Sequence, residues 1–225
     1  ENVLTGFKWI ADRIRYYEEH PVNDAPQMEF IFGCEESVGY LAGTHARDKD
    51  AVVACCLLAE VAAWCKAQGK TLLDLLDDMG AVFGLFRDSQ INIYRTGLEG
   101  QTEIKALLSA LRQQPPERFL DEKVVSVMDV ANNTIIDRAT GELLAPSGLP
   151  KSNVLVWRTA EGSQVVARPS GTEPKVKFYF STCDLKQLPI ASKAEYVERK
   201  RLLEDRHEQM RQDFKAMVDR MMGWD

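Results

Sequence analysis

The chain has 225 residues and carries 34 acidic against 28 basic side chains, which gives a formal net charge of −6. This acidic excess argues against a general nucleic-acid or membrane-surface binder, because such proteins attract their partners with a basic field. No apolar run approaches the roughly 20 residues that a membrane-spanning helix needs. The chain opens without Met inside a patterned segment, so we expect it to be a fragment of a longer protein.

The first predicted strand and helix lie between residues 28 and 69. Residues 28–33, MEFIFG, predict a short buried strand. A helix is expected to begin at Asp50, a suitable N-cap, and to stop at Gly69, a suitable C′ residue. Because this segment is apolar almost throughout, we expect the helix to be buried on most sides.

A second helix is predicted directly after the first. Thr71 and Asp74 stand in capping-box spacing at its start, and Gly80 is its expected end. A strand followed by two helices favours part of an α/β layer that lacks its first strands.

The second half of the chain alternates short strands with turn signals. A strand is predicted at 91–95, and an amphipathic helix at 101–114 is stopped by the Pro pair 115–116. Five further strands are expected at 123–130, 134–138, 153–157, 164–168 and 176–180. The turns between them are marked by Asn132-Asn133, Thr140-Gly141 and Glu161-Gly162.

A long closing helix is predicted from about Lys193 to Met222. Its apolar residues recur at spacings of three, four or seven: Leu203, Met210, Phe214, Met217 and Met221. One stripe of this helix should therefore face a sheet. We predict an α/β partial layer over residues 1–86, followed by an α+β domain over residues 87–225, an antiparallel sheet with helices on one face.

The cysteines and histidines of the chain show no metal-binding pattern. Three of the five cysteines, Cys55, Cys56 and Cys65, lie in one apolar stretch, and no C-x-x-C pair occurs. We interpret the cysteines as buried, reduced thiols of a cytoplasmic protein rather than as disulfides or metal ligands. The three histidines are too scattered to predict a zinc site.

The loop between the last two predicted strands has an unusual composition for a hairpin. Arg168 offers a planar fork that matches phosphate oxygens. Ser170 and Thr172 add hydroxyl donors, and Gly171 allows backbone N–H groups to approach an anion closely. These residue types predict a cradle for a phosphate group.

Two lysines follow the same loop. Lys175 and Lys177 lie two residues apart on a strand and therefore point to the same face. Glu173 does not suit a phosphate cradle, and we expect it to point outward. A polar surface loop with solvated charges is the alternative interpretation.

A second informative stretch, CEESVG, follows the first predicted strand. It holds two adjacent carboxylates, Glu35 and Glu36, then Ser37 and Gly39. Carboxylate and hydroxyl groups in a strand-end loop suit the hydroxyls of a sugar. The carboxylates could instead bind a metal or perform acid–base chemistry, although adjacent glutamates do not face each other across a bond. A solvated acidic turn is the third interpretation.

Four motifs together resemble the α-D-phosphohexomutase superfamily, which contains phosphoglucomutases and phosphomannomutases. They are TGFKW at 5–9, CEESVG at 34–39, RDKD at 47–50 and RPSGTEPKVKFY at 168–179. The resemblance spans nearly the whole chain. It implies that residues 1–86 are the later part of the α/β domain 3 of that superfamily, and that residues 87–225 are its C-terminal domain 4.

The resemblance also implies roles for individual residues. Glu35 and Ser37 would bind the sugar hydroxyls that are not phosphorylated, although Cys34 stands where many members have glycine. Lys49 matches a lysine near the reacting hydroxyl, either a proton shuttle or an electrostatic stabiliser. The loop near the sugar would comprise Thr5, Gly6 and Lys8. The clamp for the non-transferred phosphate would comprise Arg168, Ser170, Gly171, Thr172 and Lys177.

The reaction implied by the resemblance interconverts hexose 1-phosphate and hexose 6-phosphate through a phosphoserine enzyme and a bisphosphate intermediate. It uses Mg²⁺, with hexose 1,6-bisphosphate as activator. The chain contains neither a T-A-S-H-N-P-like serine loop nor a D-G-D-x-D-R magnesium loop. We therefore expect no metal site in this fragment, no activity from the fragment alone, and the missing N-terminal domains of the same chain as its partner.

Two other functions stay open on the sequence. A non-catalytic sugar-phosphate binding module would keep both loops without turnover. An α+β interaction protein with an incidental cationic loop would have no affinity for phosphate. Glucose, mannose and pentose phosphates are all compatible with the sugar loop, with a slight preference for glucose.

Overall fold

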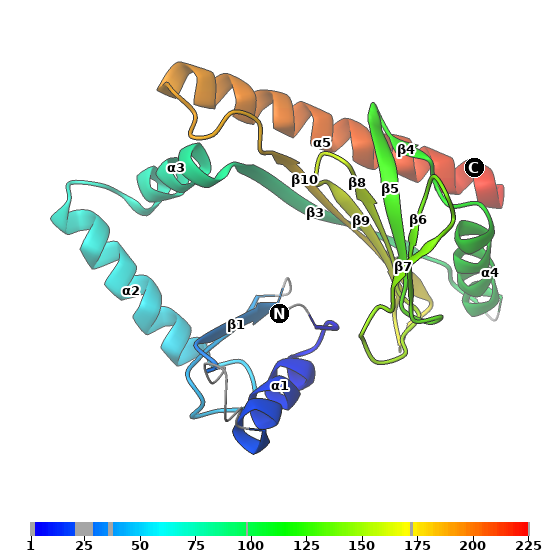
Figure 1. Ribbon diagram of the computed structural model, residues 1–225, viewed down its shortest axis with the longest axis horizontal. Helices are drawn as coiled ribbons and strands as arrows, with labels where there is room; N and C mark the ends of the chain where they lie inside the picture. The colour runs from blue at the N-terminus through cyan, green and yellow to red at the C-terminus, as the bar shows by residue number, and fades with distance from the viewer. Residues whose placement is uncertain (1–2, 21–28, 36–37, 98, 172, 225) are drawn as a thin grey trace. The chain divides into compact units, whose positions relative to one another are not determined.

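The computed structural model describes residues 3–20, 29–35, 38–97, 99–171 and 173–224 (Figure 1). The chain forms two compact units, Glu1–Leu76 and Asp77–Asp225, which are described separately below. Their boundary falls inside a helix, ten residues before the domain boundary expected from the sequence. The assignment of residues 1–86 and 87–225 to separate domains stays a prediction.

The first unit packs a helix against a two-stranded sheet. Its elements are α1 (Phe7–Glu19), β1 (Phe32–Glu35), β2 (Gly39–Ala42), α2 (Ala51–Ala67) and the start of α3 (Leu72–Phe83). Phe7 and Ile14 of α1 pack with Leu41 of β2 in a small apolar core. The expected buried strand at 28–33 is wrong in extent and burial, because pairing begins at Phe32, whose side chain is 49% exposed. Residue 28 lies outside the described residues.

Helix α2 has the ends predicted from the sequence but not the predicted burial. The Asp50 carboxylate accepts hydrogen bonds from the N–H groups of Val52 and Val53, at 2.8 and 3.1 Å. After the helix, Gly69 takes a φ of +68°, as a C′ glycine does. Cys65 is the one buried residue within α2, whose main packing partner in the described part of the chain is the short strand β2. Apolar composition alone therefore overestimated its burial.

All five cysteines are free thiols, as expected, but they are not all buried. Cys34, Cys55 and Cys56 are exposed, whereas Cys65 and Cys183 are buried.

Helix α3 begins with the predicted capping box and ends later than predicted. The N–H of Asp74 donates to Thr71 Oγ1 at 3.1 Å, and the N–H of Thr71 donates to Asp74 Oδ2 at 2.8 Å. Gly80 does not end the helix, which continues to Phe83. A Cβ at Gly80 would lie 3.0 Å from the Tyr196 ring, so this glycine permits close packing.

Among the described residues, no single helix has both the length and the apolar composition to cross a membrane. Helices α2 and α3 pass that test only as a pair, and they are bent by 86° at their junction.

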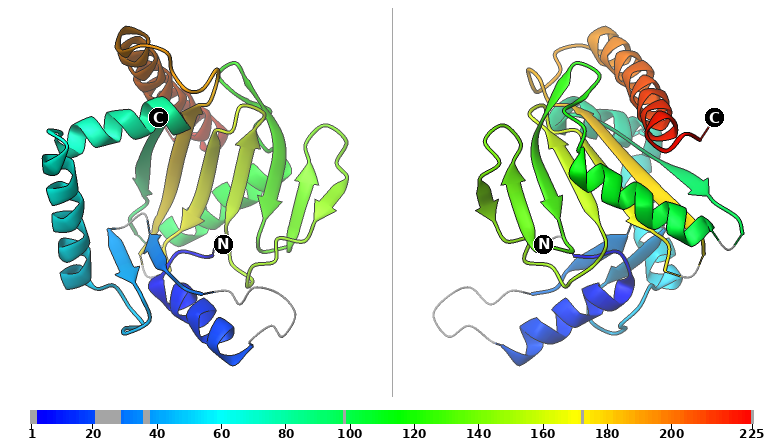
Figure 2. Two further views of the ribbon diagram at one scale, coloured as in Figure 1. Left: turned by 60° about the vertical axis from the view of Figure 1, so that its left-hand side comes forward. Right: turned by 90° about the vertical axis from the view of Figure 1, so that its right-hand side faces the viewer.

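The second unit is an antiparallel sheet with helices α4 and α5 on one face, which confirms the predicted fold class (Figure 2). The strand order is β3-β10-β9-β8-β5-β6-β7, and β4 pairs with β5. The strands are β3 (Leu85–Tyr94), β4 (Arg118–Phe119), β5 (Glu122–Asp129), β6 (Thr134–Asp137), β7 (Leu143–Ala145), β8 (Leu155–Thr159), β9 (Gln164–Pro169) and β10 (Lys175–Asp184). The helices are α4 (Gly100–Gln113) and α5 (Lys193–Met222).

The closing helix has the extent and the apolar stripe that the sequence predicts. Leu203, Met210 and Phe214 are buried, and Met217 and Met221 are partly buried against the same core. Residues of α4, of α5 and of the inner sheet face form one apolar cluster around Trp157 and Phe214. This cluster leaves the other face of the sheet for the polar side chains described below.

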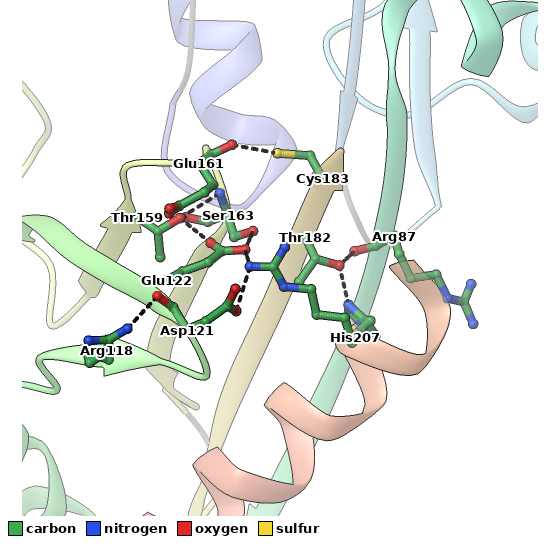
Figure 3. Close-up of polar contacts among 11 residues, drawn as sticks. Arg87, Arg118, Asp121, Glu122, Thr159, Glu161, Ser163, Thr182, Cys183 and His207 are labelled. Atoms are coloured by element: carbon green, nitrogen blue, oxygen red, sulfur yellow. Dashed lines mark hydrogen bonds and ion pairs between the residues drawn. The ribbon is translucent and has the colours of Figure 1, made fainter. Parts of the chain in front are cut away.

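A buried histidine joins α5 to two strands of the sheet. The ring nitrogens of His207 lie 2.8 Å from Thr182 Oγ1 of β10, a contact drawn in Figure 3, and 2.6 Å from Ser89 Oγ of β3. Burial lowers the pKa of His207, and the positive charges of Arg87 and Arg211 act in the same direction. The ring is therefore neutral near pH 7 and serves as a hydrogen-bonding link within the fold.

Candidate functional site

The first candidate region lies at the β1–β2 hairpin of the first unit. Glu35 is the last residue of β1 and pairs with Gly39, the first residue of β2. Oε2 of Glu35 is buried and has no hydrogen-bond partner among the described residues. Buried carboxylate oxygens are normally hydrogen-bonded, so this atom can accept a donor such as a hydroxyl. Ser37, predicted for the same region, lies outside the described residues.

The side chain of Lys49 lies near that of Glu35. A Cβ placed on Gly39 would lie 2.6 Å from Cδ of Lys49 and 2.9 Å from Cγ of Glu35, so both side chains cross the same glycine. The Lys49 ammonium donates to Asp48 Oδ1 at 2.8 Å. This hydrogen bond raises the pKa of Lys49, and the negative charge of Glu35 adds to the effect. Lys49 is therefore a protonated cation next to a carboxylate.

The start of α1 belongs to the same region. Gly6 is the N-cap of α1 with a φ of +119°, a conformation that favours glycine. The next residue, Phe7, is buried, and its ring centroid lies 5.6 Å from the Lys49 ammonium. Through Phe7 the fold brings the predicted loop residues Thr5, Gly6 and Lys8 to the neighbourhood of Lys49. The ammonium of Lys8 itself lies 5.0 Å from the Trp9 ring.

Two residues that shape this region were not predicted as part of it. Asp48 holds the ammonium of Lys49, and Phe7 lies against the same side chain. Both stand inside the TGFKW and RDKD motifs, next to predicted residues. Their position beside predicted site residues was the available signal, because no single-residue property distinguishes them.

The second candidate region is the loop between β9 and β10 of the second unit. Arg168 of β9 and Lys177 of β10 are directly paired across the sheet. Both are half-buried. Both lie on the face opposite the α4–α5 core, because the residues next to them along their strands, Ala167, Val176 and Phe178, are buried in that core. Neither makes an ion pair with any other described residue. Like charges directly opposite each other destabilise a sheet, so this arrangement favours an anion between them.

The rest of the loop presents small groups at the same end of the sheet. The N–H of Ser170 donates to the Lys175 carbonyl at 2.8 Å, and Ser170 Oγ accepts from the N–H of Glu173 at 3.2 Å. A Cβ on Gly171 would meet no atom within 4 Å, so the backbone is open there. Thr172 lies outside the described residues.

Glu173 and Lys175 form a pair that the sequence did not predict. The Glu173 side chain is 53% exposed, and its carboxylate lies 2.5 Å from the Lys175 ammonium. This ammonium also lies 5.2 Å from the centroid of the Tyr94 ring. The hydrogen bond from Glu173 raises the pKa of Lys175. The two lysines therefore differ, because the charge of Lys175 is neutralised within the loop and that of Lys177 is not.

No three His, Cys, Asp or Glu side chains gather as a metal site in the part of the chain that the structure describes. The geometry offers instead a carboxylate–ammonium pair in one unit and a cationic loop in the other.

Comparisons with known proteins relate the chain to phosphoglucomutases. Residues 1–82 match the family model for phosphoglucomutase/phosphomannomutase, alpha/beta/alpha domain III. A phosphoglucomutase of Staphylococcus epidermidis is 37% identical over 185 residues, which cover 82% of this chain and 32% of that protein. A phosphoglucomutase of Staphylococcus aureus is 37% identical over 183 residues, covering 80% of this chain and 31% of the relative.

The chain belongs to the phosphohexomutase superfamily, and residues 1–82 match its domain III. It spans about a third of the length of the curated relatives that it matches. A solved open form of parafusin, a phosphoglucomutase from Paramecium, has 15% identity and a TM-score of 0.45 over 85% of this chain and 31% of that protein.

Proposed function

We propose that this chain is the C-terminal part of a phosphohexomutase that interconverts hexose 1-phosphate and hexose 6-phosphate through a phosphoserine and a bisphosphate intermediate. The observation that carries the proposal is the direct pairing of Arg168 with Lys177, two cations without a counterion among the described residues. Family membership and the match to phosphoglucomutases support the reaction. Phosphoryl transfer relies mostly on positioning and charge stabilisation, which both regions supply.

In this proposal the first unit binds the sugar. The Glu35 carboxylate accepts hydrogen bonds from the sugar hydroxyls that are not phosphorylated, and the Ser37 hydroxyl donates to them. Thr5, Gly6 and Lys8 lie in the loop near the sugar. The raised pKa of Lys49 favours an electrostatic stabiliser over a proton shuttle, because the ammonium holds its proton near neutral pH. It would offset negative charge that develops on the reacting oxygen.

The second unit binds the non-transferred phosphate. Arg168 and Lys177 supply the positive charge, and Ser170, Gly171 and Thr172 supply hydrogen-bond donors. Mg²⁺ and the phosphoserine belong, in this proposal, to the preceding part of the full-length protein. The proposal also places the enzyme in the cytoplasm, in keeping with its five free thiols.

A coupled mutase assay tests the reaction. The full-length protein that contains this chain would be compared with the 225-residue chain, using glucose 1-phosphate and mannose 1-phosphate with Mg²⁺ and a hexose 1,6-bisphosphate. We expect turnover from the full-length protein alone, and the preferred substrate identifies the sugar. Binding without turnover in the full-length protein would replace the mutase with a non-catalytic sugar-phosphate binding module.

Arg168→Ala in the full-length protein is expected to weaken glucose 6-phosphate binding by about 1.5–3 kcal/mol, the range for a hydrogen bond to a charged group. Isothermal titration calorimetry measures this loss directly. Arg158→Ala is the matched control. Arg158 of β8 lies on the same sheet face and pairs with Gln164, which is four residues before Arg168 on β9. An equal loss in both variants, or none in Arg168→Ala, would refute the phosphate clamp.

Gly39→Ala is expected to lower kcat of the full-length enzyme by about ten- to a hundred-fold, because misplacing a reacting group by about 1 Å has effects of that size. The added methyl group would displace the side chains of Lys49 and Glu35, which pass 2.6 and 2.9 Å from its position. Ala42→Ser, at the other end of β2, should leave kcat unchanged. A Gly39→Ala enzyme with normal kcat would show that the placement of Lys49 is unimportant for the reaction.

A further inference from the structure

The face of the sheet that carries Arg168 is organised in cross-strand rows. One row pairs Tyr94 of β3 with Lys175 of β10. The next row runs from Asn92 of β3 through Lys177 of β10 to Arg168 of β9. Side chains directly opposite on one face have Cβ atoms about 4.5–5.5 Å apart, so each member of a row is within reach of its neighbour.

The two rows handle their positive charge differently. In the first row Glu173 pairs with Lys175 at 2.5 Å, and the Tyr94 ring lies against the same ammonium. In the second row the neighbour of Lys177 on β3 is the uncharged Asn92, and no carboxylate of a described residue pairs with Lys177 or Arg168. Although the chain has 34 acidic residues, the position opposite Lys177 holds an amide, where a carboxylate would neutralise the charge of Lys177.

We propose that Asn92 is a third phosphate-binding residue, with its carboxamide N–H donating to the anion held by Lys177 and Arg168. Asn92 is exposed, and none of the described residues makes a hydrogen bond to its side chain. It lies on β3, the edge strand of the sheet, more than 70 residues from the RPSGTEPKVKFY motif. This inference rests on the proposed function and adds a residue to the same site.

The geometry also explains why the neutral amide matters. A carboxylate at position 92 would stand opposite Lys177 as Glu173 stands beside Lys175, and would neutralise the cation needed for phosphate. An alanine would remove only one hydrogen-bond donor. The two substitutions should therefore weaken phosphate binding to different degrees and with different dependence on salt.

The test uses the full-length protein, with inorganic phosphate and glucose 6-phosphate as separate probes in calorimetric titrations. Asn92→Ala should weaken both probes by about ten- to a hundred-fold, as expected for one hydrogen bond to a charged group. Asn92→Asp should weaken both further, and this additional loss should shrink as ionic strength rises. Gln90→Ala and Gln90→Asp are matched controls, since Gln90 is exposed on the same strand and face, opposite Tyr179.

Wild-type affinity in Asn92→Ala, equal losses in the Gln90 variants, or a loss for glucose 6-phosphate alone would overturn the assignment of Asn92 to the phosphate. Arg168→Ala separates this inference from the proposed function. If Arg168→Ala weakens both probes while the Asn92 variants do not, the phosphate clamp stands without Asn92. If Arg168→Ala also leaves both affinities unchanged, the clamp itself is wrong.

Discussion

Phe214→Ala is expected to lower the free energy of unfolding of the second unit by about 3–5 kcal/mol, the usual cost of truncating a buried phenylalanine. The Phe214 side chain is 3% exposed. The centroid of its ring lies 4.9 Å from the ring centroid of Phe178 and 5.4 Å from that of Phe180, both on β10. The ring also packs near those of Phe119 and Trp157. The alanine variant would leave a cavity where α5 meets the sheet.

Chemical denaturation followed by circular dichroism measures this loss. Val197→Ala is a suitable control, because Val197 lies on the same helix with 56% of its surface exposed and should change the stability little. Phe214→Leu should fall between the two variants, since it keeps much of the apolar volume. A Phe214→Ala variant as stable as Val197→Ala would mean that α5 is not packed on the sheet as described.

The second unit was predictable from the sequence because its elements carry strong local signals. The stripe of α5 repeats at helical spacing over 30 residues, and the long strand β10 alternates buried and half-buried side chains. The missed strands β4 and β7 have two and three residues, too few for a period to show. Strand β3 begins at Leu85, earlier than predicted, since only its later residues alternate clearly in the sequence.

The first unit was harder to predict. Helix α1 was missed although Phe7, Ile10 and Ile14 stand at helical spacing, because charged and aromatic residues separate them. Burial of α2 was overestimated, since composition indicates what a helix can bury and not what lies beside it. The sequence does not predict strand β2, because Gly39 and the polar residues Glu35, Glu36 and Ser37 before it favour a turn.

In the candidate site, the sequence predicts which segments carry the site residues, but not which side chains contact each other. The order of the motifs predicts site roles for Glu35, Lys49 and Arg168, and these roles stay predictions. It did not show that Glu173 would pair with Lys175, because a flexible side chain chooses its partner in three dimensions. A role for Asn92 could not be predicted from the sequence either, because only the register between β3 and β10 shows that it lies opposite Lys177.

Glu122→Ala is expected to destabilise the second unit by about 3–5 kcal/mol, as the removal of one partner of a buried ion pair does. Glu122 is 1% exposed and pairs with Arg206 of α5. Its carboxylate also accepts hydrogen bonds from the hydroxyl groups of Thr159 and Ser163, the latter at 3.0 Å (Figure 3). Without the carboxylate, the hydroxyls of Thr159 and Ser163 lose a buried acceptor, and Arg206 keeps its ion pair with Asp121 alone.

Thermal and chemical denaturation of Glu122→Ala, Arg206→Ala, the double variant and a control would check this. Glu198→Ala is the matched control, because Glu198 pairs with Arg201 where both side chains are more than half exposed, and such a pair contributes less than about 1 kcal/mol. Combining Glu122→Ala with Arg206→Ala measures the coupling, which should be large if the two charges stabilise each other. Equal, small losses in the Glu122 and Glu198 variants would show that Glu122 is solvated.

The location of Glu122 connects this stability to the phosphate loop. Ser163, which donates to Glu122, immediately precedes β9, and β9 carries Arg168 at its other end. The buried carboxylate thereby holds the start of the strand whose end carries the clamp. We expect Glu122→Gln, which keeps an acceptor oxygen but loses the charge, to retain more stability than Glu122→Ala and to leave Arg168 in register with Lys177.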